Sequence, residues 1–227
     1  MDKKPSFDRF VVLDFETTGL NRGYKPVEIA WLEFDRDFAV IERVDSLINP
    51  NMAIEEGATK VHGITSTMVA DSPTLDELIV GTQGDKFRDG RTLIVAHNAK
   101  FDLPMISRYC GDATALCTMM LSFVLMPEAK NHQLGTLTEL CGVQVVPTHR
   151  ALADVEACFL LLQHFATNWS LTLERMVELT GSFNGDSVMP FGRYQGTTIK
   201  ELPSDYVDWM FGKFESEHWV VQILKNL

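Results

Sequence analysis

The order of the hydrophobic segments along the 227-residue chain constrains its fold more than any other feature. Three segments typical of β-strands come first and in direct succession, at 10–14, 27–35 and 40–48, which predicts an antiparallel meander. A fourth strand, TLIVAH at 92–97, lies between segments with helical character. Strands followed by alternating helices and strands indicate an α/β fold with a mixed sheet.

The remaining hydrophobic segments predict helices around this sheet. The longest, at 151–169, has apolar residues at helical spacing. The segment 116–125 is interpreted as a short strand that runs into a helix. The other expected helices are 65–87 with an interruption at Ser72–Pro73, 99–109, 134–141 and 172–180.

A change of composition near residue 181 predicts a second, smaller unit. The stretch GSFNGDS at 181–187 is typical of a linker. We therefore expect a main domain at 1–180 and a C-terminal module at 187–227, built from a small β-turn and a helix from about Pro203.

Two interpretations of this module remain open. In one it grips nucleic acid through charge and stacking, and in the other it packs against the main domain or a partner chain; the packing interpretation is slightly favoured. The residues for gripping are Arg193, Tyr194, Lys200 and Trp209, and those for packing are Phe191, Tyr206, Trp209 and Phe211.

Composition and charge exclude some classes of protein. Hydrophobic residues make up 45% of the chain, enough for a full core, and no run of eighteen apolar residues predicts a membrane span. The charged start MDKKPSFDRF lacks a secretory signal, so a cytoplasmic protein is expected. The four cysteines form no CxxC pair, which favours reduced, buried thiols over a zinc site. The net charge of −11 argues against broad attraction to nucleic acid, but it fits a site that concentrates carboxylates around metal ions.

Two carboxylates end the first strand. Side chains alternate along a strand, so Asp14 and Glu16 share one face while Phe15 points to the other. Thr17, Thr18 and Gly19 then turn the chain. Taken alone, this pair also suits an ordinary solvated strand end.

Two further clusters carry acids at the starts of helices. In HNAKFD, at 97–102, Asn98 is a natural helix N-cap and Asp102 lies in the first turn. In HRALAD, at 149–154, His149 precedes Asp154 by five residues, a rotation of about 140° on an ideal helix. We therefore expect His149 in the loop that enters the helix, free to reach the same site as Asp154.

The acids Asp14, Glu16, Asp102 and Asp154 predict a metal site if they converge. Four carboxylates in one place repel each other and raise each other's pKa values. Hard divalent cations such as Mg²⁺ or Mn²⁺ resolve this repulsion through oxygen ligands. Two such ions about 3.5–4 Å apart promote phosphodiester cleavage.

These motifs resemble the DEDDh group of 3′–5′ exonucleases, which have a ribonuclease-H-like fold. The resemblance covers about residues 9–165 and rests on DFETTG at 14–19, HNAKFD and HRALAD, with VHGIT at 61–65 as a further similar piece. A tyrosine variant of the superfamily would carry Tyr four residues before the last Asp. Arg150 stands at that position, so the histidine variant is favoured.

The resemblance implies a role for each motif residue. Asp14, Glu16 and Asp154 would hold one metal ion, and Asp14 would bridge to a second ion to which Asp102 contributes. His149 would take the proton from the attacking water, a role that suits a side chain titrating near neutral pH. Mg²⁺ is the expected ion, with two per site and with Mn²⁺ as a substitute.

Other residues are expected to contact the substrate, a DNA 3′ end. By resemblance, the Thr17 backbone contacts the terminal 3′-OH and Leu20 wedges against the last bases. His62, Asn98 and Phe101 are placed at the terminal nucleotide. Simple packing is the alternative for Leu20, His62 and Phe101. The four cations that could touch phosphates are Lys100, Arg150, Arg193 and Lys200.

The resemblance thus implies a metal-dependent 3′–5′ exodeoxyribonuclease that releases 5′-mononucleotides, and it suggests DNA repair as the setting. The same chemistry on RNA is one alternative. A proofreading subunit that acts with a polymerase is another. A catalytically dead binding protein is disfavoured because all four acids and the histidine are present. No membrane contact is expected, and no protein partner is identified.

Overall fold

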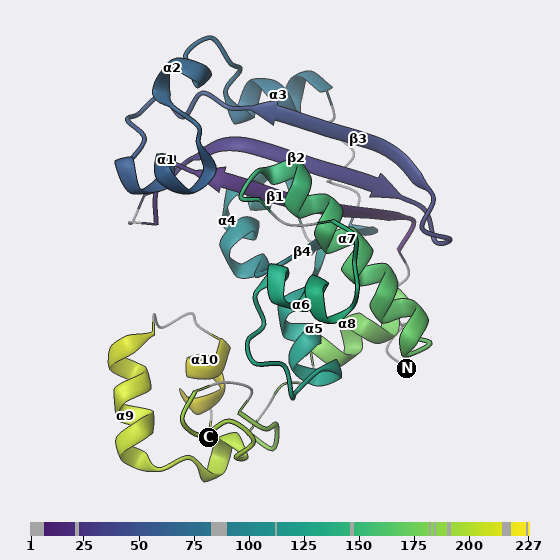
Figure 1. Ribbon diagram of the computed structural model, residues 1–227, viewed down its shortest axis with the longest axis vertical. Helices are drawn as coiled ribbons and strands as arrows, with labels where there is room; N and C mark the ends of the chain where they lie inside the picture. The colour runs from purple at the N-terminus through teal and green to yellow at the C-terminus, as the bar shows by residue number, and fades with distance from the viewer. Residues whose placement is uncertain are drawn as a thin grey trace.

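A five-stranded mixed sheet forms the centre of the computed structural model (Figure 1). Its order is β3-β2-β1-β4-β5. The strands are β1 Arg9–Thr17, β2 Pro26–Phe34, β3 Val40–Leu47, β4 Thr92–Ala96 and β5 Thr114–Cys117. The structure describes residues 7–20, 23–82, 90–111, 113–145, 148–181, 183, 185–189, 192–214, 219–225 and 227.

The pairing of β1 leaves its last residues available for a site. β1 pairs antiparallel with β2 along its length, with Glu16 opposite Glu28, and β2 pairs antiparallel with β3. On its other side β1 pairs in parallel with β4 only at 9–12. Since β4 ends at Ala96, the second half of β1 runs past it, and the next helix begins beside this overhang.

Helices cover both faces of the sheet. One face packs against α5 Thr118–Leu125, α6 Leu134–Leu140, α7 Ala151–Asn168 and α8 Leu173–Gly181. The other packs against α3 Leu75–Thr82 and α4 Ala99–Cys110. Two short helices, α1 Glu56–His62 and α2 Ser66–Val69, lie near the end of β1 (Figure 1).

Alternation along β1 divides its side chains between two cores. Phe10 and Val12 enter the core under α7, while Val11, Leu13 and Phe15 enter the core under α4. Asp14 and Glu16 continue the α7 side of this alternation. The buried position of Phe15 confirms the expectation that it faces the core.

The expected elements are confirmed, with shifted ends. β1 extends to Thr17 because its pairing with β2 continues beyond the apolar run. β5 starts at Thr114, two residues early, because it pairs with β4 from Leu93 onward. The segment 65–87 is interrupted as expected between α2 and α3, and its end at 83–87 lies outside the described residues. Helix α1 was not expected.

The C-terminal module has a small core of its own. Its elements are the bridge Val188–Thr198, the 3₁₀ turn η1 Ile199–Glu201, α9 Ser204–Lys213 and α10 Trp219–Lys225. The β-turn and the helix after Pro203 were expected, and α10 was not. Buried residues within 189–221 make up its core, among them Met189, Ile199 and Met210. Of the expected linker, residues 182 and 184 lie outside the described part, as does Phe191.

Two expectations from composition can be compared with the structure. All four cysteines are free, and Cys110 and Cys158 are buried. Among the described residues, no helix combines the length and the apolar character needed to cross a membrane.

Candidate active site

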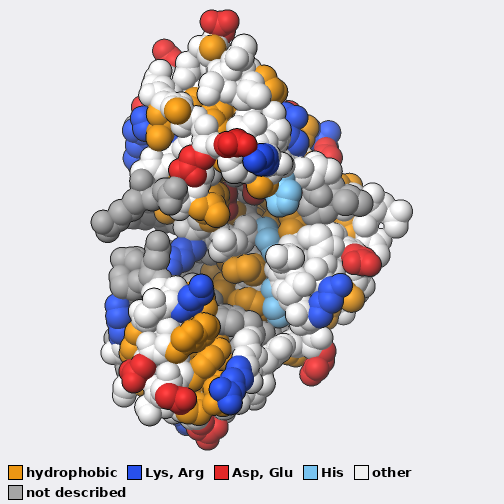
Figure 2. Space-filling view, turned by 60° about the vertical axis from the view of Figure 1, so that its left-hand side comes forward, with side chains coloured by type: hydrophobic (Ala, Val, Ile, Leu, Met, Phe, Trp, Pro, Cys, Tyr) orange, Lys and Arg blue, Asp and Glu red, His pale blue; other side chains and the backbone are white. Residues whose placement is uncertain are grey.

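A cleft of about 1320 Å³ opens where β1, α4 and α7 meet. Asp14, Glu16, Asp102, His149 and Asp154 all line it, so the structure brings together the five residues that the sequence singled out. Figure 2 looks into this hollow, which separates an upper from a lower lobe and has histidine side chains along one side.

Glu16, His149 and Asp154 stand close enough to share one ion. One ligand atom from each lies within 4.8 Å of the others. Glu16 comes from the end of β1, and Asp154 comes from the first turn of α7. These residues, 138 positions apart in sequence, meet because α7 packs across β1 and β2.

The turn before α7 places His149 over the site. Asp154 accepts a hydrogen bond from the backbone N–H of Thr148 through Oδ1 at 2.9 Å, which closes the chain back onto the helix. His149 has a left-handed backbone with φ of 54°, and its side chain is exposed. The expectation that His149 precedes the helix rather than sharing its face is confirmed.

Asp102 reaches the site from the opposite layer and is almost fully buried. It accepts a hydrogen bond from the backbone of Phe15, in the part of β1 that runs past β4. Its Oδ1 has no hydrogen-bond partner among the described residues. A buried carboxylate oxygen without a partner is costly in a folded protein, and a cation would satisfy it.

The acids raise each other's pKa values. Burial, followed by the charges of Asp102 and Asp154, raises the pKa of Asp14 well above its ordinary value. Burial and the charge of Asp154 raise the pKa of Glu16 to about 8. Burial also raises the pKa values of Asp102 and Asp154. Ionising all four therefore requires positive charge, and the oxygen donors fit a hard divalent cation.

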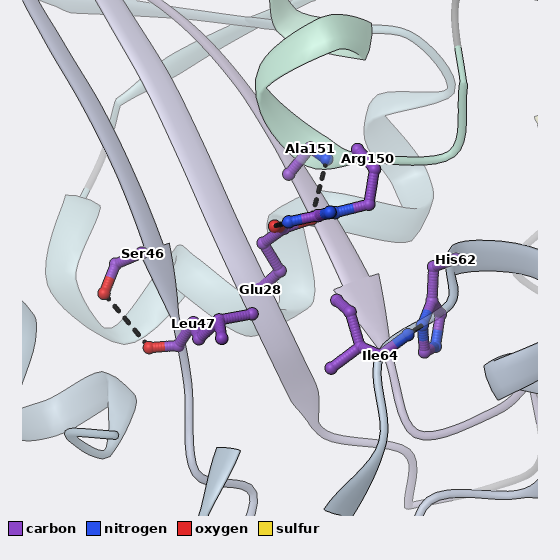
Figure 3. A network of polar contacts seen from close by, with 7 residues as sticks. All are labelled: Glu28, Ser46, Leu47, His62, Ile64, Arg150 and Ala151. Carbon is purple, nitrogen blue, oxygen red and sulfur yellow. Dashed lines mark hydrogen bonds and ion pairs between the residues drawn. The ribbon is translucent and has the colours of Figure 1, made fainter. Parts of the chain in front are cut away.

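Glu28 supports the site and was missed from the sequence. This buried carboxylate on β2 lies opposite Glu16 and accepts hydrogen bonds from the Arg150 guanidinium at 2.5 to 3.1 Å. It also accepts a bond at 2.9 Å from the Ala151 N–H, the first residue of α7 (Figure 3). Glu28 thus ties both residues that follow His149 to the sheet. Its signal in the sequence is weak, because it is one acid within an apolar strand.

His62 supports the backbone of Thr17. The Ile64 N–H donates to His62 Nδ1 at 2.9 Å, so Nε2 carries the proton and donates to the Thr17 carbonyl at 3.1 Å. Burial lowers the pKa of His62 and favours this neutral form. Figure 3 shows the ring of His62 beside Ile64. His62 also lines the cleft, but its side chain is only 5% exposed. This burial favours the packing interpretation of His62 over direct contact with a nucleotide.

The remaining expected substrate residues lie at the cleft in different ways. Leu20 is 82% exposed at its edge, which excludes core packing for this side chain. Phe101 is half-buried and stacks on Tyr24 with ring centroids 5.1 Å apart. Asn98 is exposed and occupies the N-cap position of α4 as expected, but its backbone is left-handed and its side chain makes no cap hydrogen bond.

The four candidate phosphate-binding cations are not equivalent. Arg150 bonds to Glu28, and Lys200 forms an ion pair with Asp186. The guanidinium of Arg193 lies 5.5 Å from the ring centroid of Tyr194, and Lys100 is exposed at the start of α4. The structure therefore gives Arg150 a structural role in place of a free phosphate contact.

Two family models match the chain. Residues 11–162 match the RNase_T model, described as an exonuclease. Residues 185–215 match a separate model, described as a putative quorum-sensing-regulated virulence factor. The second match coincides with most of the C-terminal module.

Individual proteins match as well. Exodeoxyribonuclease 10 of Escherichia coli is 30% identical over 212 residues, covering 90% of this chain and 91% of that protein. A DNA polymerase III subunit epsilon-like protein of Rhodobacter capsulatus is 40% identical over 159 residues, 65% of this chain and 22% of that protein. A solved structure, Exonuclease X in complex with 5′ overhanging duplex DNA, is 30% identical with a TM-score of 0.59, covering 76% of this chain and 99% of that one. The fold is therefore that of known exonucleases.

Proposed function

This chain belongs to the RNase_T exonuclease family, and from that premise we propose that it is a metal-dependent 3′–5′ exodeoxyribonuclease. It hydrolyses DNA from 3′ ends and releases 5′-mononucleotides. The observation that carries the proposal is the approach of Glu16, His149 and Asp154 to within 4.8 Å, with Asp14 and Asp102 behind them in the same cleft.

We assign the metal site to the four acids. Asp14, Glu16, Asp102 and Asp154 would hold the metal ions through their carboxylate oxygens. Mg²⁺ is the proposed ion because every ligand is a carboxylate oxygen, and Mn²⁺ is expected to substitute. When bound, the ions supply charge stabilisation at the phosphodiester and favour attack by water.

The protein's own residues orient the substrate and move the proton. His149, exposed over Glu16 and Asp154, accepts the proton of the attacking water. The Thr17 backbone, fixed by His62, is the proposed contact for the terminal 3′-OH. Leu20 and Phe101 are proposed to hold the last bases, since one is exposed and the other half-buried at the cleft. Asn98 is proposed to contact the terminal nucleotide from its exposed position.

DNA is proposed over RNA because the printed names of the relatives with the widest coverage specify DNA. Trimming of 3′ ends during DNA repair is the setting that this activity suits. A proofreading role beside a polymerase is a second candidate, favoured by the polymerase-related proteins that match the exonuclease domain. A cytoplasmic location is proposed on the four free thiols.

A digestion time course tests the proposal. The substrates are 5′-labelled single-stranded DNA, a 3′-tailed duplex and RNA of matched sequence, each with Mg²⁺, with Mn²⁺ or with EDTA. We expect a metal-dependent ladder that shortens from the 3′ end, faster on DNA. Faster digestion of RNA would replace the substrate class, and an absence of digestion would reject the function.

Two variants separate the site from general effects on the fold. Asp14→Asn should remove the ladder. Asp35→Asn is the matched control, because Asp35 lies at the opposite end of the sheet and accepts backbone hydrogen bonds from 37 and 39 that an amide oxygen can also accept. The control should digest DNA at the wild-type rate.

A further inference from the structure

The catalytic cleft continues onto the C-terminal module. Gly192, Gln195 and Phe214 line the same cleft as the four acids. Gln195 also donates a hydrogen bond to the Pro127 carbonyl at 3.1 Å, so the module contacts the loop between α5 and α6 directly. In Figure 2 the lower lobe is this module, and hydrophobic side chains gather on its side toward the hollow.

Four aromatic rings form a connected row that begins at the cleft. Trp209 stacks on Tyr206 with centroids 5.2 Å apart and rings inclined by 18°, and it meets Phe214 edge-on at 6.1 Å. Tyr194 contacts Tyr206 at 4.7 Å. Trp209 is 50% exposed even though it belongs to this row. We call Tyr194, Tyr206, Trp209 and Phe214 the aromatic face.

The backbone around the aromatic face requires a glycine at its edge. Gly192 has φ of 76°, and a Cβ there would lie 2.5 Å from the Tyr206 hydroxyl. The left-handed backbone favours glycine at this position, and a side chain there would displace the Tyr206 hydroxyl. The position of Tyr206 is therefore built into the turn rather than left to the surface.

Positive charge accompanies the aromatic face. The Arg193 guanidinium lies over the Tyr194 ring. On α9, at about 100° per residue, Lys213 lies about 20° from Tyr206 and about 40° from Trp209, whereas Asp208 lies about 160° from Tyr206. Asp205 is closer to this side, at about 40° from Trp209. In Figure 2, Lys and Arg side chains lie next to the hydrophobic patch of the lower lobe, and Asp and Glu side chains lie along its lower edge.

We propose that the aromatic face binds unpaired nucleotides of the same DNA strand whose 3′ end lies at the catalytic acids. Flat rings next to cations are the chemistry that binds single strands without sequence preference, through stacking on bases and contact with phosphates. The continuity of the cleft favours this occupant, because Gly192, Gln195 and Phe214 of the module line the same cleft as the four acids. The cleft volume exceeds the roughly 300–1,000 Å³ typical of a small-molecule pocket, which leaves room beyond one terminal nucleotide.

This inference rests on the proposed function, and its test compares substrates of different length. The substrates are the p-nitrophenyl ester of thymidine 5′-monophosphate, which offers one nucleotide, and oligothymidylates of 4 and 20 nucleotides. Trp209→Ala should raise KM for the 20-mer about 5- to 100-fold, from the loss of stacking on one base, with kcat unchanged. It should leave the ester unaffected.

Phe211→Ala is the matched control. Phe211 is an exposed aromatic residue on the same helix, 42% exposed, but it lies about 140° from Tyr206 and so outside the aromatic face. This variant should behave as wild type on all substrates. A loss of similar size in Phe211→Ala would mean that the helix as a whole was disturbed, and it would reject the assignment to the aromatic face.

A binding measurement without turnover separates the inference from the proposed function. In EDTA, fluorescence anisotropy of labelled 20-mer should show a Kd raised by a similar factor in Trp209→Ala and a smaller salt dependence in Arg193→Gln. Arg193→Gln also serves if Trp209→Ala fails to fold. Equal Kd and KM for wild type and both variants would overturn the inference while leaving the exonuclease intact. Failure of the wild type to hydrolyse any substrate would instead reject the proposed function.

An equal loss on blunt duplex DNA in Trp209→Ala would also overturn the proposal, because paired bases cannot stack on the rings. The face would then bind the duplex rather than unpaired nucleotides.

Discussion

The acidic end of the sheet and the C-terminal module differ in what they bury and what they expose. Around Asp14 and Asp102, charged groups are buried, and each supporting bond is fixed by a strand or a helix start. In the module, a small hydrophobic core supports a surface on which aromatic side chains such as Trp209 are exposed. Chemistry requires groups held in place against their own repulsion, whereas sequence-tolerant binding requires only accessible flat surfaces. Substitutions should therefore affect turnover at the first region and affinity at the second.

The largest effect is expected for Asp14→Asn. Asp14 is surrounded by the charges of Asp102, Asp154 and Glu16, so it stands at the centre of the acidic cluster. Turnover should fall by at least about 10³-fold, more than the loss of one hydrogen-bond donor costs a charged site. Single-turnover digestion measures this, and binding of 20-mer DNA in EDTA should persist. Full activity in this variant would remove the distinction between the two regions.

His149→Ala should lower kcat by about 10²–10⁴-fold. His149 is exposed and contributes no buried packing, so the fold and most of the metal affinity should be kept. Titration calorimetry with Mn²⁺, beside the pH profile of kcat, measures both properties. A loss of metal affinity as large as the loss of kcat would make His149 a ligand instead of a base.

Glu28→Gln should lower kcat by about 10–100-fold, as loss of a supporting residue does at other metal sites. The expected cause is a looser turn at His149, since Glu28 holds both Arg150 and Ala151. Glu33→Gln is the matched control. Like Glu28, Glu33 is a buried glutamate of β2 that pairs with an arginine, in this case Arg9 at 3.0 Å.

Both glutamine variants should lose some stability, but only Glu28→Gln should change kcat and the pH profile of kcat. Equal kinetic effects from the two variants would show that β2 acts only through the stability of the fold.

Without metal, Glu16 should make a contribution to stability that is lost as the pH rises from about 4.5 to 8. Burial and neighbouring charge raise the pKa of Glu16 in the folded state from 4.5 to about 8, so within this window the folded chain binds more protons than the unfolded chain. Thermal melts in EDTA across this range measure the effect. The difference in melting temperature between wild type and Glu16→Gln should change across this window, and saturating Mg²⁺ should reduce that change. A difference that does not depend on pH would contradict the raised pKa of Glu16.

The smallest effect is expected for Gln195→Ala. This substitution removes one hydrogen bond between the exposed Gln195 side chain and the Pro127 carbonyl, and surface substitutions usually change stability by no more than about 0.5 kcal/mol. The main unfolding transition should be unchanged within about 0.5 kcal/mol. A shift of several degrees in differential scanning calorimetry would show that the two regions unfold as one.

The convergence of the acidic residues on one cleft could be predicted from the sequence because their pattern is local. Asp14, Asp102 and Asp154 each lie at the end or start of an apolar segment, and the periods of strands and helices are readable from neighbours alone. The predicted ends of the strands were less accurate. β1 and β5 extend as far as their partner strands continue to pair, which the local sequence does not show.

Long-range support could not be read from the sequence. Glu28 and Arg150 are 122 residues apart, and only the docking of α7 on β2 brings them together. For the same reason the bonds of Arg150 to Glu28 could not be foreseen, and Arg150 was interpreted as a possible phosphate contact. These differences arise from tertiary contacts that a local pattern does not contain.

The distribution of the acids along the chain has a consequence during synthesis. Asp14 emerges first and Asp154 last, and the two are joined only when α7 docks across the sheet. A nascent chain that has not reached Asp154 therefore lacks one of the acids, and an unfolded chain holds the acids apart, so neither has an assembled site. A cell that makes this protein meets the nuclease only after folding, so translation itself delays a potentially harmful activity.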